Sequence, residues 1–311
     1  YLFLEEKEIH RKEQILDVFS KELPYTYRGY SVHFSSPDPN DNGVRHGEYI
    51  EAGRVNPLIF MYTPESFLKE YIGKTDVSHL EPLDWLSFSE HRLLALSKRE
   101  LYWDALHLQE KLKGISYYPE TVWLYLLASC WAVIGQEQAF VKRCGMRGDD
   151  IGSRIICGRI AERLMRLCFL YTKSYAPYSK WFGTAFSNLP IDSKIKENIG
   201  QAMAADTIQK REKALVQAQA LVGEMHNQSA VTEPVPFSIT HYFNRDIQVI
   251  YADRFAEAIY GKLKGTIFEK MPPVGTFSQI GNFTAAAEPV IYQKAVANFY
   301  RSLALADEEI V

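Results

Sequence analysis

Residues 148–173 read GDDIGSRIICGRIAERLMRLCFLYTK and decide the fold. The stretch predicts one helix over residues 149–172, in which each residue advances by about 100° around the axis. On that helix Arg159, Arg163 and Arg166, here called the arginine stripe, share a sector of about 60°. Apolar residues flank the stripe on both sides: Ile155 and Phe169 on one side, and Ile156, Ile160 and Leu167 on the other. We therefore expect the helix to pack against other elements on both sides of the stripe, with the guanidinium groups facing a cleft.

Positive charges that lie close together in a partly desolvated site repel one another, so the stripe requires negative charge nearby. Guanidinium groups match carboxylates and phosphates with two parallel hydrogen bonds. Two partners satisfy this requirement. One is the phosphate of a bound ligand; the other is the protein's own acids, for which the sequence offers Glu137, Asp149, Asp150 and Glu162.

The segment SYAPYSKWFGTAF, residues 174–186, follows this helix and is here called the aromatic corner. Pro177 predicts a break between two helices, because proline disfavours helical geometry at the residue before it. The break places four candidate binding residues around a turn: Tyr175, Tyr178, Lys180 and Trp181. Aromatic faces beside a cation suit a nucleobase or sugar above a phosphate, but tyrosine and tryptophan also fill ordinary helical cores.

The rest of the chain predicts an α+β fold that is predominantly α, in two domains. Residues 1–75 indicate a partial α/β unit, with an amphipathic helix within residues 5–23 and too few strands to close a sheet: 1–4, 30–36 and 57–63. Residues 76–311 indicate a helical bundle, with helices expected in 89–98, 103–112, 119–134, 136–144, 176–186, 191–225 and 288–304. Residues 245–252 resemble a strand that either returns to the first sheet or forms a small hairpin.

Composition narrows the classes of function. The net charge of −3 provides no global basic field for duplex nucleic acid. The apolar run Val122–Gly135 is too short to cross a membrane, and no histidine or cysteine spacing predicts a metal site. The four cysteines, read as reduced core residues, favour a cytoplasmic protein: Cys130, Cys144, Cys157 and Cys168. The sequence indicates no particular oligomeric state.

Several phrases together resemble a bacterial family of uncharacterised proteins related to the nucleotidyltransferases: DWLSFSEHRLLAL, LYWDALHLQEKL, YYPETVWLYLLASCW, IGQEQAFVKRCGMRGDDIGSR, RLMRLCFL and YAPYSKWFGTAF. The resemblance implies a small nucleotidyltransferase-like sheet that holds Mg²⁺ through carboxylates, and a helical domain that covers the second substrate. It also implies a Gly-Ser motif and a paired-acid strand, which we expect upstream of Tyr1. No metal-ligand role passes to any residue of this sequence, so the catalytic residues are unassigned.

The resulting hypothesis is a nucleotidyltransferase-like protein that moves a nucleoside monophosphate from a nucleoside triphosphate, with Mg²⁺, to a small hydroxyl- or amino-bearing acceptor. In it, the arginine stripe contacts phosphates or anchors an acidic residue, Lys180 balances phosphate charge, and Tyr175, Tyr178 and Trp181 line the base or acceptor pocket. The alternative is a non-catalytic module that senses a nucleotide or holds a partner protein.

Overall fold

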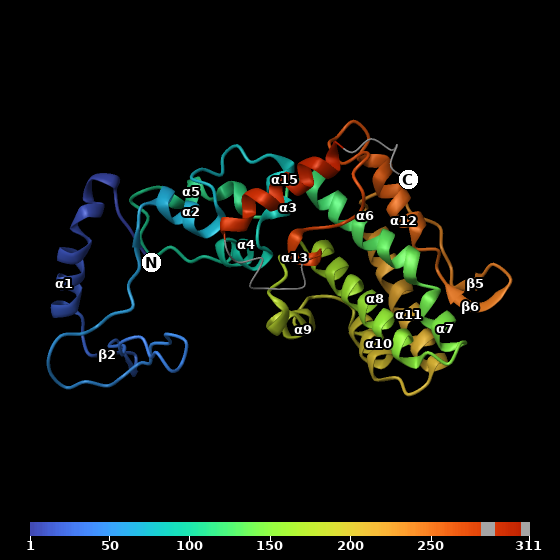
Figure 1. Ribbon diagram of the computed structural model, residues 1–311, viewed down its shortest axis with the longest axis horizontal. Helices are drawn as coiled ribbons and strands as arrows, with labels where there is room; N and C mark the ends of the chain where they lie inside the picture. The colour runs from blue at the N-terminus through green and yellow to red at the C-terminus, as the bar shows by residue number, and fades with distance from the viewer. Residues whose placement is uncertain (281–289, 306–311) are drawn as a thin grey trace. The chain divides into compact units, whose positions relative to one another are not determined.

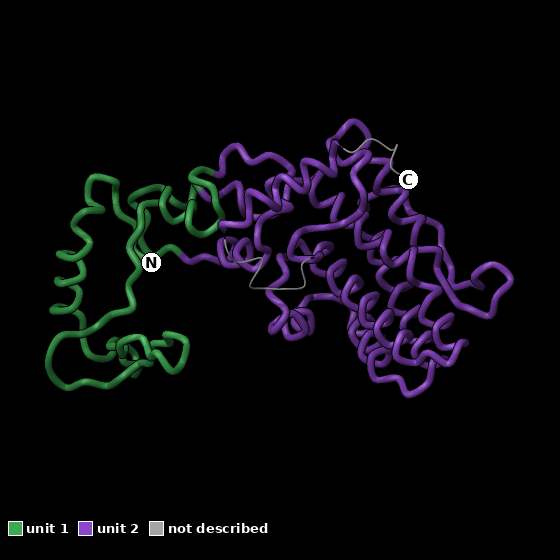
Figure 2. The backbone as a smooth tube through the Cα atoms, in the orientation of Figure 1, with its two compact units in different colours: residues 1–76, 101–111 green, residues 77–100, 112–311 purple. Residues whose placement is uncertain are grey.

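The computed structural model describes residues 1–280 and 290–305, which form two compact units. Unit 1 comprises Tyr1–Asp76 and Leu101–Lys111, and unit 2 comprises Val77–Glu100 and the chain from Leu112 onward (Figure 2). Each unit is therefore built from two separate segments of the sequence.

Unit 1 contains short helices and two pairs of two-residue strands, with little regular sheet. Its elements are β1 (Leu2–Phe3), the 3-10 helix η1 (Glu6–Arg11), α1 (Lys12–Glu22), β2 (Thr26–Tyr27), β3 (Tyr30–Ser31), β4 (Met61–Tyr62), α2 (Pro64–Ile72) and α5 (Leu108–Lys111). β1 and β4 are parallel, with Leu2 opposite Met61, whereas β2 and β3 form an antiparallel pair. A nucleotidyltransferase-like sheet is therefore not shown by the described residues.

The strands predicted at residues 30–36 and 57–63 are shorter than expected for a local reason. After Ser31 the chain forms only an isolated bridge from Phe34 to Gly47, and the turn-forming residues that follow close a loop in which Asp38 bridges Val44. Pro57 lacks the amide hydrogen that a continuous ladder requires. Pairing consequently resumes only at Met61.

Unit 2 is helical, as the sequence predicts, apart from one hairpin (Figure 1). Its elements are α3 (Pro82–Ser87), α4 (Glu90–Ser97), η2 (Lys113–Ile115), α6 (Glu120–Glu137), α7 (Phe140–Gly145), α8 (Asp150–Tyr171), α9 (Ser179–Ser187), α10 (Ser193–Ala204), α11 (Ile208–Gln228), β5 (Thr240–Tyr242), β6 (Arg245–Val249), α12 (Asp253–Lys262), α13 (Phe277–Ile280), η3 (Val290–Tyr292) and α15 (Gln293–Ala304).

Helix α6 forms the centre of unit 2. It packs against α8 and α12, and its residues from Val122 to Trp131 are all buried. Burying one large apolar side chain contributes roughly 1.5–3 kcal/mol, so this helix carries much of the hydrophobic stabilisation of the unit. None of the helices within residues 1–280 and 290–305 has both the length and the apolar character needed to cross a membrane.

The long helix predicted over residues 149–172 is confirmed as α8, and the strand-like segment 245–252 forms the hairpin alternative, with β6 antiparallel to β5. Two other predictions are wrong in detail. The helix expected from residue 103 begins only at Leu108, because the Asp104 carboxylate accepts the amide hydrogens of Leu108 and Gln109 and thus starts a new helix there.

The second correction concerns residues 191–225, which form two helices instead of one. Thr207 lies between α10 and α11 and accepts a hydrogen bond from the amide of Lys210, so it caps the start of α11. The helix predicted over residues 288–304 is present as η3 and α15, except for Glu288 and Pro289, which lie outside the described residues.

Candidate functional site

Helix α8 positions the arginine stripe. The helix begins where the Asp149 side chain accepts the amide hydrogen of Gly152, at 2.7 Å. It ends before Lys173, whose positive φ of 51° lies in the left-handed region that helices do not continue through. Its core-facing residues include Cys157, Ile160 and Leu164, all buried, so the orientation of the opposite face is fixed.

Two arginines of the stripe are paired with acids of the protein. Arg159 forms an ion pair with Glu137 at the end of α6. Arg166 is paired with Glu162, at 2.9 Å, and with Glu90, at 3.3 Å. For Arg159 and Arg166, the opposing charge is therefore supplied by the protein's own acids. One oxygen of Glu137, Oε2, is buried and accepts no hydrogen bond from the described part of the chain.

Arg163 differs from its two neighbours on the stripe. Across residues 1–280 and 290–305 its side chain, which is half-buried, forms neither an ion pair nor a hydrogen bond. Arg163 is close enough to α6 to act on Cys130. Burial raises the pKa of the Cys130 thiol to about 11, and the positive charges of Arg163 and Arg166 act in the opposite direction. Guanidinium groups pair with carboxylates and phosphates, and Arg163 is the arginine of the stripe that lacks such a partner within the described residues.

Glu90 joins the stripe to the aromatic corner. Its Oε2 accepts from Arg166, and its Oε1 accepts the amide hydrogen of Ala176, at 3.2 Å. Burial raises the pKa of Glu90, and the adjacent Arg166 charge acts in the opposite direction. The guanidinium of Arg166 also lies over the Phe182 ring, 5.1 Å from its centroid. This buried pair therefore fixes both α8 and the chain that leads into α9.

The residues of the aromatic corner divide into a buried and an exposed group. Tyr175 is only 2% exposed and packs against the rings of Tyr117 and Tyr118, with centroids 5.1 and 4.8 Å away. Its hydroxyl donates to the carbonyl of Ile115. In this arrangement the Tyr175 ring supports the corner from the inside and offers no surface to a ligand in solvent.

Tyr178, Lys180 and Trp181 reach the surface. Trp181 is 49% exposed, and the Lys180 ammonium lies 5.3 Å from the centroid of its ring. Tyr178, 37% exposed, meets the His91 ring edge-on at 5.9 Å. The corner thus presents a half-exposed indole ring with the Lys180 ammonium over it.

Sequence reasoning missed two parts of this arrangement. It named Glu137 and Glu162 among possible partner acids, but it did not identify Glu90, which is 76 residues from Arg166. It also missed Arg211, which is 1% exposed and binds Asp150 and Ser153 at the start of α8. No local pattern marks either residue, because both meet α8 only through tertiary packing.

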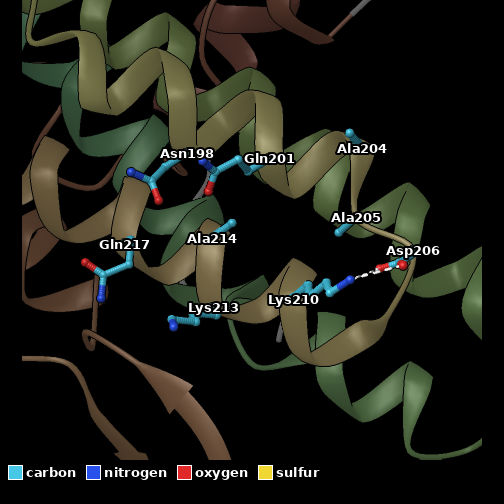
Figure 3. A pocket seen from close by; sticks show the side chains of 9 residues that line it. All are labelled: Asn198, Gln201, Ala204, Ala205, Asp206, Lys210, Lys213, Ala214 and Gln217. Carbon is cyan, nitrogen blue, oxygen red and sulfur yellow. Dashed lines mark hydrogen bonds and ion pairs between the residues drawn. The ribbon is translucent and has the colours of Figure 1, made fainter.

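A separate groove of about 560 Å³ lies along α10 and α11 (Figure 3). Its polar lining includes amide side chains and two lysines, of which Lys210 is paired with Asp206 at 3.0 Å. The lining residues are Asn198, Gln201, Ala204, Ala205, Asp206, Lys210, Lys213, Ala214 and Gln217. The groove contains none of the residues that the sequence proposed for a site.

The Mg²⁺ implied by the resemblance requires a group of oxygen ligands. The described residues contain no cluster of three His, Cys, Asp or Glu side chains that could hold a metal ion. The side chains present therefore do not fit this ion, and the chemistry below is limited to what the chain's own groups do.

Comparison with protein-family models found a match over about the middle third of the chain. No curated protein and no solved structure matches the chain. Residues 85–182, which include Glu90, the whole arginine stripe, and the aromatic corner as far as Phe182, match the protein family described as a domain of unknown function, DUF4037.

Proposed function

We propose that unit 2 binds the phosphate groups of a nucleoside triphosphate at the arginine stripe, with Arg163 as the principal ligand-binding side chain. The proposal rests on the observation that Arg163 is half-buried and unpaired among the described residues, whereas Arg159 and Arg166 form ion pairs with glutamates. Partial burial lowers the local dielectric constant, so an incoming phosphate would bind more strongly there than at an open surface.

The two paired arginines have a different part in this proposal. The ion pairs of Arg159 and Arg166 hold α8 against α6 and α4, and thereby fix the position of Arg163 between them. Such preorganisation reduces the entropy lost on binding.

The exposed residues of the aromatic corner complete the proposed site. The open Trp181 ring suits the face of a nucleobase or a sugar, and Lys180 beside it supplies a second positive charge for phosphate. Tyr178 borders the same turn, whereas Tyr175 contributes by supporting it from within.

The reaction we propose for this site is transfer of a nucleoside monophosphate to a small hydroxyl- or amino-bearing acceptor. The chain's own groups would hold phosphate and acceptor in position for in-line displacement, and positioning supplies a large part of catalysis in such reactions. A second candidate is a non-catalytic nucleotide-sensing or protein-interaction module, for which the stripe and the corner suffice because binding alone needs no carboxylate cluster.

Isothermal titration calorimetry with ATP, GTP, CTP and UTP, each with Mg²⁺, tests the binding proposal. For the nucleotide that binds, Arg163→Ala should weaken affinity by roughly 10- to 100-fold, the range expected for a charge-assisted hydrogen bond. Lys180→Met should weaken it less. Arg154→Ala provides the matched control, because Arg154 lies on the same helix but is exposed and paired with Asp150.

Equal heats for the wild type and Arg163→Ala would refute nucleotide binding at the stripe. Release of pyrophosphate from the bound nucleotide, measured over a panel of small alcohols and amines, then separates the two candidates. Release that requires an acceptor supports transfer, whereas tight binding without release supports the sensing module.

A further inference from the structure

Three aromatic rings cluster at the β5–β6 hairpin and are here, with the residues beside them, called the tip: Tyr242 and Phe243 at the turn, and Tyr251 just after β6. Tyr242, Phe243 and Tyr251 lie within contact of one another, with Phe243 4.8 Å from Tyr242 and 6.2 Å from Tyr251 between ring centroids. The hairpin projects from the helices of unit 2 (Figure 1). Phe243 is 70% exposed, so its ring contributes little to any core.

Two arginines accompany these rings. The guanidinium of Arg245 lies 5.6 Å from the centroid of Tyr242, and that of Arg254 lies 5.2 Å from the centroid of Tyr251. Neither forms an ion pair with an acid in the part of the chain that the structure describes. Both side chains belong to exposed residues, so their charges are available to a partner.

The acid of the hairpin is paired with a lysine of another element. Asp246 is bound by the ammonium of Lys142 on α7, at 3.1 Å, and the same ammonium binds Glu212 on α11, at 3.0 Å. The single charge of Lys142 is shared between these two acids, and the positive charges that lie against the rings themselves are those of Arg245 and Arg254. This arrangement favours an anionic partner.

The backbone of the tip is held in a costly conformation. Phe243 and Tyr251 both have φ of 53°, in the left-handed region that costs an aromatic residue of order 1–3 kcal/mol. The Tyr251 hydroxyl fixes this geometry, because it accepts the amide hydrogen of Phe243 at 3.1 Å and donates to the carbonyl of His241. The ring of Phe243 is largely exposed, so its burial does not offset the free-energy cost of this backbone conformation.

The base of the hairpin is rigidly attached to the helices. Ile247 and Val249 are buried against Ala139. The side-chain carbonyl of Gln138 accepts the amide hydrogen of Ile250, and Glu212 accepts that of Gln248. The tip is therefore a preformed surface on a fixed support, and binding to it would require little ordering of the hairpin.

We propose that this tip, formed by Tyr242, Phe243, Arg245, Tyr251 and Arg254, binds single-stranded nucleic acid. An unpaired base would stack on the exposed Phe243 ring, and the two guanidinium groups would contact the flanking phosphates. Rings and cations lie side by side here, as bases and phosphates do along a single strand. An acidic peptide would satisfy the arginines but would offer no flat face to Phe243.

A duplex fits this surface less well, because its base faces are stacked inside the helix and the chain as a whole has a net charge of −3. The inference does not depend on the proposed nucleotide site. The hairpin shares no residue with the arginine stripe or the aromatic corner, and it lies outside the family match at residues 85–182.

Fluorescence anisotropy tests the proposal with fluorescein-labelled oligouridylate and oligothymidylate, a duplex of the same length, and a labelled polyglutamate peptide. The wild type should bind the single strands at low salt and the duplex and the peptide much more weakly. Phe243→Ala should weaken single-strand binding about 5- to 100-fold, the range for loss of one stacked base, and Phe243→Tyr should retain it.

The salt dependence gives a second readout. Two phosphate contacts predict a slope of about −1.4 for the logarithm of the association constant against the logarithm of salt concentration, and Arg245→Ala should reduce it to about −0.7. Phe299→Ala serves as control, because that ring is also partly exposed but lies on α15. Equal binding by Phe243→Ala and the wild type, equal binding of the duplex, or binding of polyglutamate alone would overturn the proposal.

Discussion

The hydroxyl of Tyr171 lies 2.8 Å from Nδ1 of His226, inside the helical core of unit 2. Thr232 fixes the direction of this bond, because its hydroxyl hydrogen is donated to the carbonyl of Glu233 and its oxygen, 2.9 Å from Nε2 of His226, must then accept from that nitrogen. The hydrogen of the neutral His226 ring is therefore on Nε2, so Nδ1 accepts from the Tyr171 hydroxyl. The indole N–H of Trp131 donates to the same hydroxyl, at 2.8 Å.

Removing the central hydroxyl of this chain should destabilise unit 2. In Tyr171→Phe the indole N–H of Trp131 and Nδ1 of His226 both lose their partner inside the core. Each unpaired buried group costs about 1–3 kcal/mol, so we expect a loss of roughly 2–5 kcal/mol in the free energy of unfolding, measured by urea denaturation. Tyr178→Phe is the control because Tyr178 is partly exposed; equal losses in both variants would contradict this assignment.

His226 should make the protein less stable in acid. Burial lowers the pKa of His226 to about 4 from an ordinary value of 6.5. Between those two values the unfolded chain binds a proton that the folded chain does not, so stability falls as the pH falls from about 6.5 toward 4. The loss has an upper limit of about 3 kcal/mol and is complete below pH 4.

Unfolding measured between pH 7.5 and 4.5 checks this pH dependence. His226→Gln should have lower stability at pH 7.5 but a shallower decline toward acid than the wild type, because it lacks the titrating ring. His241→Gln, which removes an exposed histidine, should decline as the wild type does. Parallel curves for the wild type and His226→Gln would show that this ring is not the source.

Neutralising Glu90 should cost far more than neutralising Glu162, although both bind Arg166. Glu90 is buried, so Glu90→Gln leaves the buried Arg166 charge with a single acid and should lower the free energy of unfolding by roughly 3–5 kcal/mol. Glu162 is more exposed, and Glu162→Gln should cost no more than about 1 kcal/mol. Chemical denaturation of the two variants provides the comparison. Similar losses in the free energy of unfolding would contradict a larger stabilising role for the Glu90 contact.

Gly135 should not tolerate a methyl group. A Cβ atom at this position would lie 2.7 Å from the backbone nitrogen of Asp253, at the start of α12, and backbone atoms cannot move aside as a flexible side chain can. Gly135→Ala should therefore destabilise the contact between α6 and α12 by roughly 1–3 kcal/mol. Gly158→Ala on α8 is the matched control, since its Cβ would meet only the end of Met203 at 3.8 Å.

In the control, alanine should raise stability by up to about 1 kcal/mol, because glycine in a helix interior is unfavourable by that amount. Thermal unfolding of the two variants gives opposite shifts in Tm if the close approach of α12 is as described. A rise in Tm for Gly135→Ala would be inconsistent with it.

Much of unit 2 follows from local sequence. The spacing of Arg159, Arg163 and Arg166 places them on one face of α8 in any helix, since the period of 3.6 residues depends only on backbone geometry. Pro177 likewise disfavours helical geometry at Ala176, in the linker between α8 and α9, wherever the chain lies. By contrast, the loop before Leu108 and the break at Thr207 depend on single side-chain caps, which periodicity does not reveal.

The sequence by itself determined that α8 carries three arginines on one face and that an aromatic turn follows it, because both are set by contacts within a few residues. Only the tertiary structure decided that Glu90 and Glu137 bind two of those arginines and leave Arg163 unpaired among the described residues. The physical reason is that an ion pair depends on where folded segments meet, and Glu90 reaches Arg166 across 76 residues of chain.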